Sequence, residues 1–382
     1  MNIMPGAMLG LLGGGQLGRM FVMAAHSMGY RVTVLDPSID CPAGCIADRF
    51  ICADYTDRNT LHELGSTCAG ITTEFENIPA ESLRILAEYC FVSPDARCVS
   101  ITQDRILEKQ FLVANGFSVA PFLVIQNPDE LSITQYSDLF PGILKVSRFG
   151  YDGKGQIRVN TQAELNTAFA DLNNKSCVLE RLMPLVCEIS VIVARGVDDE
   201  LRLFPVAENQ HDHGILDISI IPARISRDIA QKAQEIAIRV AEKLNYRGVL
   251  CVEFFILEND QLLINEIAPR PHNSGHYTID ACITSQFEQQ VRTLCGIPLG
   301  STSMHSAAVM VNLLGDLWQK NEPNWKQVLQ YSSTKLHLYG KREARPRRKM
   351  GHYTVLDTTT ETALQQALKI KHSLNPNPSL DN

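Results

Sequence analysis

VEFFILENDQLLINEIAPRPHNSGH, residues 252–276, holds two apolar runs around the polar pair Asn259-Asp260, a pattern typical of a β-hairpin. A two-residue turn at this pair places Glu253 directly across from Glu266, with their Cβ atoms about 5 Å apart. Side chains alternate between the two faces of a strand. Glu253 is therefore expected on the same face as Phe255 and Leu257, and Glu266 on the same face as Leu262 and Ile264. The sequence therefore predicts two facing carboxylates on a largely apolar surface.

Two like charges on such a surface repel each other, and burying them unpaired costs about 3–5 kcal/mol. A hard divalent cation bound by both carboxylates converts this repulsion into ligation. Asn265 and Asn273 offer neutral oxygens nearby, and Arg270 offers a cation for a phosphate group. We interpret the segment as a magnesium site that faces a phosphate. The alternative is a solvated hairpin face with two unrelated glutamates.

Composition narrows the class of protein. The chain has 382 residues, 45% of them hydrophobic, which is too long for one ordinary core and indicates two or three domains. A net charge of −7 argues against nucleic acid or an anionic membrane as the main partner. The eleven cysteines include no CxxC pair, which favours reduced thiols in a cytoplasmic protein. We find no signal-peptide pattern and no apolar run near the ~20 residues that span a bilayer.

Residues 1–101 alternate short strands with helices, the pattern of a Rossmann-like α/β domain. The expected elements are strands at 8–12, 31–36, 70–73 and 91–92, another strand near residue 50, and a helix over 18–28. Residues 13–18, GGGQLG, satisfy G-x-G-x-x-G, and Asp36 ends the next strand, so together they predict a dinucleotide-binding turn. Glycines are equally required wherever a backbone approaches any phosphate at a helix N-terminus, which leaves a second interpretation open.

Two further units are expected, at residues 102–296, with a flap subdomain at about 117–185, and at residues 297–382. The first opens with a helix predicted over 100–116, with Ser100 or Thr102 as its cap. The other expected elements are strands at 142–146, 156–159, 177–181, 188–194, 307–313 and 335–338, and helices at 226–244 and 361–372. The tail, residues 375–382, is expected to be disordered.

A loop with three glycines and two cations, residues 147–155, lies between two expected strands just after Lys145. Glycine allows the backbone N–H groups to approach phosphate oxygens closely, while Lys145 and Lys154 neutralise their charge. The loop lacks the Walker pattern, and the alternative is a long exposed hairpin turn. Residues 180–183, ERLM, end a later strand, where backbone groups can pair with an adenine edge and Glu188 can accept from ribose hydroxyls.

The order of these features resembles the ATP-grasp superfamily, in which two subdomains clamp ATP and paired acids hold magnesium. Four motifs narrow the resemblance to the 5-(carboxyamino)imidazole ribonucleotide synthase family: GGGQLGRM at 13–20, GYDGKGQ at 150–156, APRPHNSGH at 268–276 and RKMGH at 348–352. The resemblance extends from about Leu9 to His352. It implies an α/β and α+β architecture, an ATP-grasp fold with an N-terminal Rossmann-like pre-ATP-grasp domain and a small β-rich C-terminal domain.

The resemblance also implies functional residues. The ATP site comprises Arg105, Lys145, Gly150, Tyr151, Asp152, Gly153, Lys154, Gly155, Gln156, Glu180, Arg181, Leu182, Met183, Glu188, His211, Asn265 and Glu266. The implied metal ligands are Glu253, Glu266 and Asn273. The implied ribonucleotide contacts are Gly15, Gln16, Leu17, Glu74, Asn77, Arg270, His272, Asn273, Lys341 and Arg348. The implied catalytic groups are Asp152, Arg270 and Lys349. Arg347 departs from the family pattern, which commonly has a small residue there.

The implied enzyme is a carbon–nitrogen ligase that uses ATP, bicarbonate and Mg²⁺, with Mn²⁺ as an alternative metal. It carboxylates 5-aminoimidazole ribonucleotide through carboxyphosphate in purine biosynthesis and releases ADP and phosphate. The family further implies a cytoplasmic homodimer that hands its product to the carboxyaminoimidazole ribonucleotide mutase. The competing hypotheses are a formate-dependent glycinamide ribonucleotide transformylase, an NAD-dependent oxidoreductase built on the glycine turn, and a catalytically silent homologue.

Overall fold

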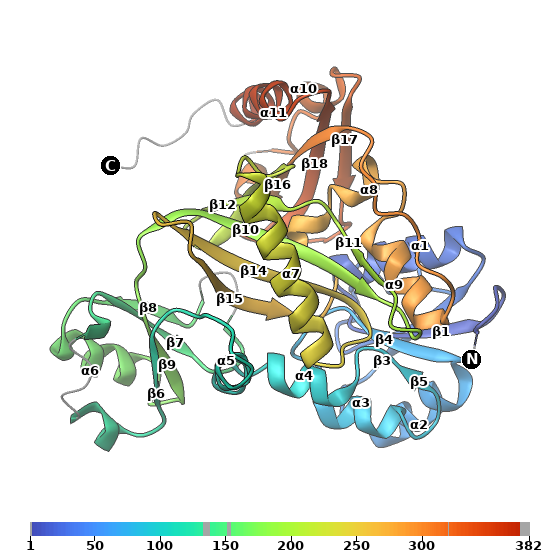
Figure 1. Ribbon diagram of the computed structural model, residues 1–382. Helices are drawn as coiled ribbons and strands as arrows, with labels where there is room; N and C mark the ends of the chain where they lie inside the picture. The colour runs from blue at the N-terminus through green and yellow to red at the C-terminus, as the bar shows by residue number, and fades with distance from the viewer. Residues whose placement is uncertain (1, 133–137, 151–153, 320, 375–382) are drawn as a thin grey trace.

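The computed structural model describes residues 2–132, 138–150, 154–319 and 321–374. Within these residues the strands form three sheets of five, four and nine strands. In Figure 1 the four-stranded sheet (green) projects on one side of the central nine-stranded sheet, and the N-terminal sheet (blue) lies on the other side. No helix in the described part of the chain is both long and apolar enough to cross a membrane.

The N-terminal domain is a parallel sheet in the order β3-β2-β1-β4-β5, which confirms the expected Rossmann-like unit. Its elements are β1 (Met8–Leu12), α1 (Gln16–Ser27), β2 (Arg31–Asp36), β3 (Arg49–Cys52), α2 (Arg58–Thr67), β4 (Gly70–Thr73), α3 (Ala80–Leu86) and β5 (Phe91–Val92). Helix α1 begins two residues before the predicted start at residue 18, because the chain passes from the glycine turn directly into the helix.

The predicted helix over 100–116 is wrong: two helices, α4 (Ala96–Thr102) and α5 (Arg105–Ala114), occupy this region. Neither expected residue caps them. Asp104 has extended backbone angles that break the helix, and its carboxylate accepts a hydrogen bond from the N–H of Ile106 at 2.9 Å. An aspartate at this position caps a helix well because its side chain satisfies an N–H that has no partner within the helix.

The projecting subdomain is an antiparallel sheet in the order β6-β9-β7-β8. Its elements are β6 (Phe122–Ile125), the 3₁₀ helix Pro128–Ser132, β7 (Gly142–Val146), β8 (Gln156–Val159), α6 (Gln162–Asp171) and β9 (Cys177–Arg181). Three of these strands have the predicted bounds. The glycine-rich loop connects β7 to β8, and its residues 151–153 lie outside the described residues.

The central sheet follows the order β15-β14-β10-β12-β13-β16-β18-β17, with β11 beside β10. Its strands are β10 (Leu185–Arg195), β11 (Leu201–Leu203), β12 (Ala207–Asp212), β13 (Ile215–Ile221), β14 (Gly248–Leu257), β15 (Leu262–Ala268), β16 (Ala307–Leu314), β17 (Thr334–Leu338) and β18 (Lys349–Asp357). Because β13 pairs with β16, the sheet is continuous across the expected boundary at residues 296–297.

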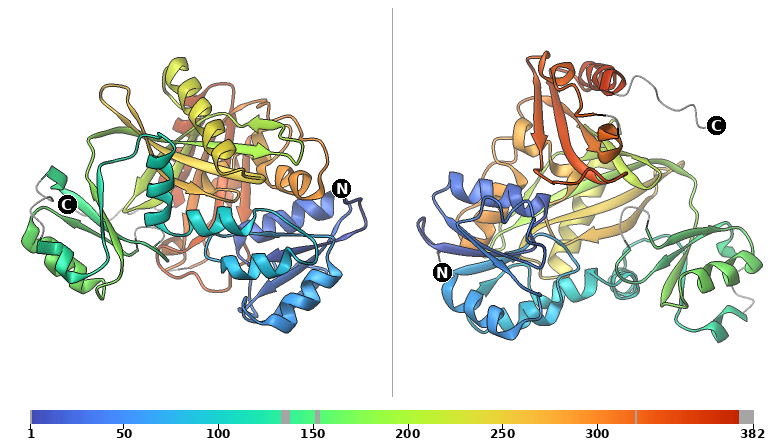
Figure 2. Two further views of the ribbon diagram at one scale, coloured as in Figure 1. Left: turned by 60° about the horizontal axis from the view of Figure 1, so that its bottom comes forward. Right: turned by 180° about the vertical axis from the view of Figure 1, so that it is seen from behind.

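Helices cover the faces of this sheet. They are α7 (Arg227–Lys243), α8 (Thr278–Ala281), α9 (Gln286–Cys295), α10 (Lys326–Leu329) and α11 (Thr360–Leu374). Helix α7 crosses in front of β14 and β10 in Figure 1, and α11 packs on β13, β16 and β18. Figure 2 shows from behind how α9 lies against the N-terminal domain, where Val291 and Leu294 join the core of β1 and β2.

The hairpin of β14 and β15 forms as predicted, but its turn differs. The N–H of Leu257 donates to the carbonyl of Gln261, and Asp260 adopts a left-handed conformation with φ +61°. The loop therefore has three residues, and the predicted two-residue turn at Asn259-Asp260 is wrong. A left-handed residue that closes a three-residue loop is a common alternative in hairpins.

The longer turn shifts the pairing by one residue, so that Phe255 faces Leu263. A bulge at Asn265 then corrects the shift, and Glu253 faces Glu266 as expected. The predicted neighbours of Glu266 were wrong for the same reason. Leu262 and Ile264 pack into the core under α7, whereas Leu263 shares the face of the acid pair.

We expect the core between the central sheet and α7 to dominate stability. Phe254 is 1% exposed in this core, and its replacement in Phe254→Ala leaves a cavity that lowers the free energy of unfolding by about 3–5 kcal/mol. Urea denaturation followed by circular dichroism measures the loss. Leu329→Ala, at a side chain 59% exposed, is the control. Equal losses of stability in the two variants would contradict a dominant role for this core.

Candidate active site

A cleft of about 750 Å³ lies where the three parts of the chain meet. The residues named from the sequence that line it are Gln16, Leu17, Glu74, Asn77, Arg105, Lys145, Gly150, Gln156, Glu180, Arg181, Leu182, Met183, Glu188, His211, Glu253, Asn265, Glu266, Arg270, His272, Asn273 and Lys349. They come from all three sheets and their connections. The fold thus gathers into one cavity side chains that are widely separated in sequence.

The acid pair lies in the floor of this cleft, on the edge hairpin of the central sheet. Arg105 Nη1 lies 3.1 Å from Glu266 Oε2, and His272 Nε2 lies 3.2 Å from Glu253 Oε1. Burial and the charge of Glu266 raise the pKa of Glu253 to about 7. Burial would also raise the pKa of Glu266, but Arg105 and Lys145 hold it below its usual value. A further positive charge beside the pair would favour full ionisation of both carboxylates.

The side chains around the pair include atoms without a partner. Asn273 is 6% exposed, and neither its Oδ1 nor its Nδ2 forms a hydrogen bond with any residue that the structure describes. Asn265 Oδ1 is in the same condition. Buried polar atoms are rarely left unpaired, so these atoms, which line the cleft, are available to a ligand or to water. Two carboxylates and amide oxygens are the donors that Mg²⁺ and Mn²⁺ prefer, so this donor set fits such an ion.

Beside the acids, two lysines surround a single carboxylate. Lys145 Nζ donates to Glu180 Oε2 at 3.0 Å, and Lys109 Nζ lies 3.5 Å from the same oxygen. Burial opposes the charge on Glu180, but the two ammonium groups outweigh burial and lower its pKa to about 2. The cluster fixes the ammonium group of Lys145 at the wall of the cleft.

The glycine turn is filled from within the chain. Glu74 Oε2 accepts a hydrogen bond from the N–H of Gly18 at 2.7 Å, and Glu74 Oε1 accepts one from the N–H of Gly15. A Cβ at Gly15 would lie 2.4 Å from that carboxylate, which explains the glycine. The N–H of Gly14 donates to Asp36 at 2.7 Å. A dinucleotide cannot use N–H groups already bound to carboxylates, so the NAD interpretation of this motif is not supported.

Other expected residues lie apart from the cleft or cannot be placed. Gly15, Lys154, Gly155, Lys341 and Arg348 do not line the cavity, although Lys341 Nζ donates to the carbonyl of Lys349 at 2.6 Å. Arg347 adopts a left-handed conformation, and its N–H donates to Asp316 at 2.6 Å on the surface. Tyr151, Asp152 and Gly153 lie outside the described residues.

The sequence analysis missed two side chains, Glu108 and Lys109, both 1% exposed or less. Glu108 accepts a hydrogen bond from the N–H of Ile267 at 2.5 Å, and Lys109 Nζ donates to the carbonyl of Asn265 at 3.0 Å. Burial and the neighbouring Glu266 raise the pKa of Glu108 to about 8. The spacing of both residues from Arg105, three and four positions along the helix, was the signal that could have identified them.

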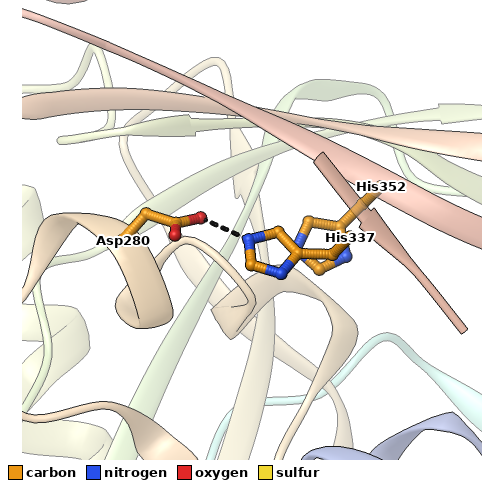
Figure 3. A group of neighbouring side chains, drawn as sticks. All are labelled: Asp280, His337 and His352. Carbon is orange, nitrogen blue, oxygen red and sulfur yellow. Dashed lines mark hydrogen bonds and ion pairs between the residues drawn. The ribbon is translucent and has the colours of Figure 1, made fainter. Parts of the chain in front are cut away.

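A further cluster of possible ligands lies outside this cleft, where Asp280 Oδ2 and His337 Nε2 are 2.8 Å apart and His352 is adjacent (Figure 3). The rings of His337 and His352 stack with an interplanar angle of 17°. The lone pairs of stacked rings lie in parallel planes and do not converge on one ion. This arrangement favours a packed, hydrogen-bonded group over a metal centre.

Comparisons with known proteins agree with this architecture. Residues 7–103 match the ribonucleotide synthetase pre-ATP-grasp domain, residues 110–287 the ATP-grasp domain, and residues 308–366 the phosphoribosylaminoimidazole carboxylase C-terminal domain. The N5-carboxyaminoimidazole ribonucleotide synthase of Bacillus subtilis is 43% identical over 364 residues, which cover 95% of each chain. The chain belongs to the N5-carboxyaminoimidazole ribonucleotide synthase family. The expected resemblance and the ATP-grasp fold class are confirmed.

Solved structures of the family show the same fold. The Staphylococcus aureus N5-carboxyaminoimidazole synthetase complexed with ADP has a TM-score of 0.89 and 39% identity, covering 97% of this chain and 98% of that one. The Aspergillus clavatus synthase in complex with ADP and 5-aminoimidazole ribonucleotide has a TM-score of 0.89 and 30% identity, covering 97% and 99%. The transformylase, oxidoreductase and silent-homologue hypotheses are set aside, because these relatives are N5-carboxyaminoimidazole ribonucleotide synthases.

The buried Lys145–Glu180–Lys109 cluster makes stability depend on pH. The pKa of Glu180 falls from about 4.3 in the unfolded chain to about 2 in the folded one. Its contribution is therefore complete above pH ~4.3 and is lost as the pH falls toward 2. Glu180→Gln leaves two buried ammonium groups without a counter-ion, and we expect it to lower the free energy of unfolding by about 3–5 kcal/mol at pH 7.

Urea midpoints measured from pH 7 down to pH 2 check this expectation. The difference between the parent and Glu180→Gln shrinks as the pH falls from about 4.3 to about 2. Glu242→Gln, at an exposed position near the end of α7, should keep the parent profile. If the difference between the parent and Glu180→Gln stayed constant across this range, ionised Glu180 would not be the source of the pH dependence.

Proposed function

We propose that the protein carboxylates 5-aminoimidazole ribonucleotide with bicarbonate, using ATP, to form N5-carboxyaminoimidazole ribonucleotide, ADP and phosphate in purine biosynthesis. The observation that carries the proposal is the facing pair Glu253 and Glu266 in a cleft shared by three domains of this family. The relatives carry the name of this activity, and one of them is solved with ADP and the ribonucleotide.

The nucleotide is proposed to lie between the flap subdomain and the central sheet. Residues 180–183 line the cleft at the end of β9 and provide backbone groups for an adenine edge. Glu188 Oε2, 3.0 Å from His211 Nδ1, is proposed to accept from the ribose hydroxyls. Lys145 and the glycine loop are proposed to bind the phosphates. Glu253, Glu266 and Asn273 are proposed to hold Mg²⁺, which would neutralise the phosphate charge that develops in the reaction.

The ribonucleotide is proposed to lie on the opposite side of the acid pair. Gln16, Leu17 and Asn77 line this side of the cleft, together with Glu74. Arg270 Nε is 2.5 Å from Glu76 Oε2, and this ion pair directs the guanidinium at the junction of the two ligand sites. Lys349 reaches the cleft from the C-terminal part and supplies a cation for a phosphorylated substrate.

The proposed chemistry has two steps. A bicarbonate oxygen attacks the γ-phosphorus of ATP, the bond to the bridging oxygen breaks, and ADP leaves carboxyphosphate behind. The exocyclic amine then attacks the carboxyl carbon, phosphate leaves with the bonding electrons, and the amine loses a proton. Arg270 stabilises the charge on the transferred phosphoryl group. Lys349 and Asp152 are proposed to handle the amine proton, although Asp152 lies outside the described residues.

The wider setting is proposed from the same assignment. All eleven cysteines are free thiols, which supports a cytoplasmic enzyme. The carbamate product is labile to acid, so its direct transfer to the carboxyaminoimidazole ribonucleotide mutase would protect it. A homodimer is the expected assembly.

The activity is tested by following ADP release from purified protein with Mg²⁺, ATP and labelled bicarbonate, with and without 5-aminoimidazole ribonucleotide. We expect ADP release to require the ribonucleotide and label to enter an acid-labile product. Formate in place of bicarbonate should support neither. ATP turnover without incorporation of label would overturn the proposal.

Replacing one of the facing acids should abolish catalysis without loss of the fold. Glu266→Gln removes a charged ligand of the proposed metal site, and we expect ADP formation to fall by at least ~100-fold, while circular dichroism and the unfolding midpoint stay close to those of the parent. Glu258→Gln, in the exposed turn of the same hairpin, is the matched control. Near-normal turnover in Glu266→Gln would disprove the metal assignment.

Loss of His272 should impair use of the ribonucleotide more than use of ATP. The imidazole lines the cleft beside Glu253, on the side proposed for the ribonucleotide. We expect His272→Ala to raise the KM for the ribonucleotide ~10-fold, equivalent to about 1.4 kcal/mol, with a change in ATP affinity below ~3-fold. His305→Ala, at an exposed histidine, is the control. Equal losses of affinity for the ribonucleotide and for ATP would contradict the placement of His272 in the ribonucleotide site.

A further inference from the structure

One face of α5 lies against the strand that carries Glu266. Arg105, Glu108 and Lys109 are separated by three and four positions, so their side chains project from the same side of the helix. Glu108 and Lys109 are buried, and Arg105 and Glu108 lie at the wall of the cleft. Three ionisable residues on one helix face inside the protein require specific partners, because an unpaired buried charge is strongly destabilising.

These side chains contact three consecutive residues of β15. Lys109 Nζ donates to the carbonyl of Asn265 at 3.0 Å, and Arg105 Nη1 donates to the carboxylate of Glu266 at 3.1 Å. Glu108 Oε1 accepts from the N–H of Ile267 at 2.5 Å. A helix face and a strand segment are thus joined by one contact per residue. Two of these contacts hold the backbone, and the third holds the acid itself.

The contacted segment is the bulge in the hairpin. Asn265 is the extra residue that changes the pairing, and it brings Glu266 opposite Glu253. A bulge interrupts the regular ladder of hydrogen bonds between the strands and leaves backbone groups in need of other partners. The carbonyl of Asn265 and the N–H of Ile267 obtain those partners from α5.

Helix α5 is itself fixed to the nucleotide side of the cleft. The N–H of Arg105 donates to the carbonyl of Ser147, the residue that follows β7, at 2.8 Å. Lys109 Nζ lies 3.5 Å from Glu180, the same carboxylate that Lys145 contacts. The helix therefore connects the acid pair to the strands that carry the flap subdomain.

We propose that Glu108 and Lys109 are positioning residues that hold the bulge of β15 in the register where Glu266 faces Glu253. The inference deepens the proposed function and rests on the metal site assigned to these acids. Neither residue touches a substrate in this scheme. They act through the backbone of residues 265 and 267, and Arg105 complements them by orienting the carboxylate of Glu266.

The substitutions are chosen to separate positioning from general stability. Glu108→Leu removes the acceptor for the N–H of Ile267, whereas Glu108→Gln keeps a carbonyl oxygen at the same position. Lys109→Met keeps most of the side-chain volume and removes the donor to Asn265. Gln110→Leu, on the exposed side of the same helix, introduces the same side chain as Glu108→Leu away from β15.

Hydrogen exchange without ligands tests the contact directly. In the free protein, a peptide covering residues 262–268 should exchange at least ~10-fold faster in Glu108→Leu than in the parent. Glu108→Gln and Gln110→Leu should keep the parent rate. Exchange in a peptide covering β16 reports the global fold and should be unchanged in all four variants. An unchanged rate in residues 262–268 of Glu108→Leu would overturn the proposal.

Metal affinity tests the consequence. The electron paramagnetic resonance signal of free Mn²⁺, titrated in the presence of ADP, should show binding weakened ~10-fold or more in Glu108→Leu and Lys109→Met, as is usual for partners of metal ligands. Glu108→Gln should restore affinity to within ~3-fold of the parent. Faster exchange with unchanged Mn²⁺ affinity in Glu108→Leu would show that the bulge does not control the acid pair.

These outcomes are distinct from failure of the proposed function. If the parent binds Mn²⁺ with ADP but incorporates no bicarbonate, the reaction assignment fails and the positioning role stands. If the parent carboxylates normally while Glu108→Leu has parent exchange rates and parent Mn²⁺ affinity, the positioning role fails and the reaction stands.

Discussion

Repulsion between two buried carboxylates is the constraint on which the cleft depends. Glu253 and Glu266 face each other on adjacent strands, and burial raises the pKa of Glu253 to about 7. Arg105 and Lys145 stabilise the charge of Glu266, whereas at Glu253 burial and Glu266 outweigh the contributions of His211 and Asn265. A cation bound by both carboxylates would favour their ionised forms, and this links the hairpin to the proposed phosphate chemistry.

Cations reach the pair because three parts of the chain converge on it. Arg105 comes from the helix after the N-terminal domain, Lys145 from the flap subdomain, and Arg270 from the connection after β15. Each cation is held by a carboxylate. Arg270 contacts Glu76, Lys145 contacts Glu180, and Arg105 contacts Glu266 of the pair itself. Charge neutralisation thus depends on the relative placement of the domains, which couples the geometry of the proposed metal site to the fold as a whole.

Local patterns in the sequence predicted most strands, because alternation and glycine-bounded apolar runs are local properties. They also predicted that Glu253 faces Glu266, but through a two-residue turn that does not form. The actual register results from Asp260 in a left-handed conformation and a bulge at Asn265, which offset each other. The alternation of apolar residues predicts neither the left-handed residue nor the bulge. Their partners, Glu108 and Lys109, lie over 150 residues away in sequence, so the sequence of the hairpin itself does not reveal these contacts.

The glycine turn shows why a motif alone does not determine a ligand. G-x-G-x-x-G requires only that the backbone approach an acceptor closely, and the pattern does not specify whether that acceptor belongs to a ligand or to the chain. Here Glu74 occupies the N–H groups of Gly15 and Gly18. Burial raises the pKa of this carboxyl, while the two N–H groups favour its ionised form. The turn therefore orients Glu74 toward the cleft, and a dinucleotide motif becomes a support for one wall of the proposed ribonucleotide site.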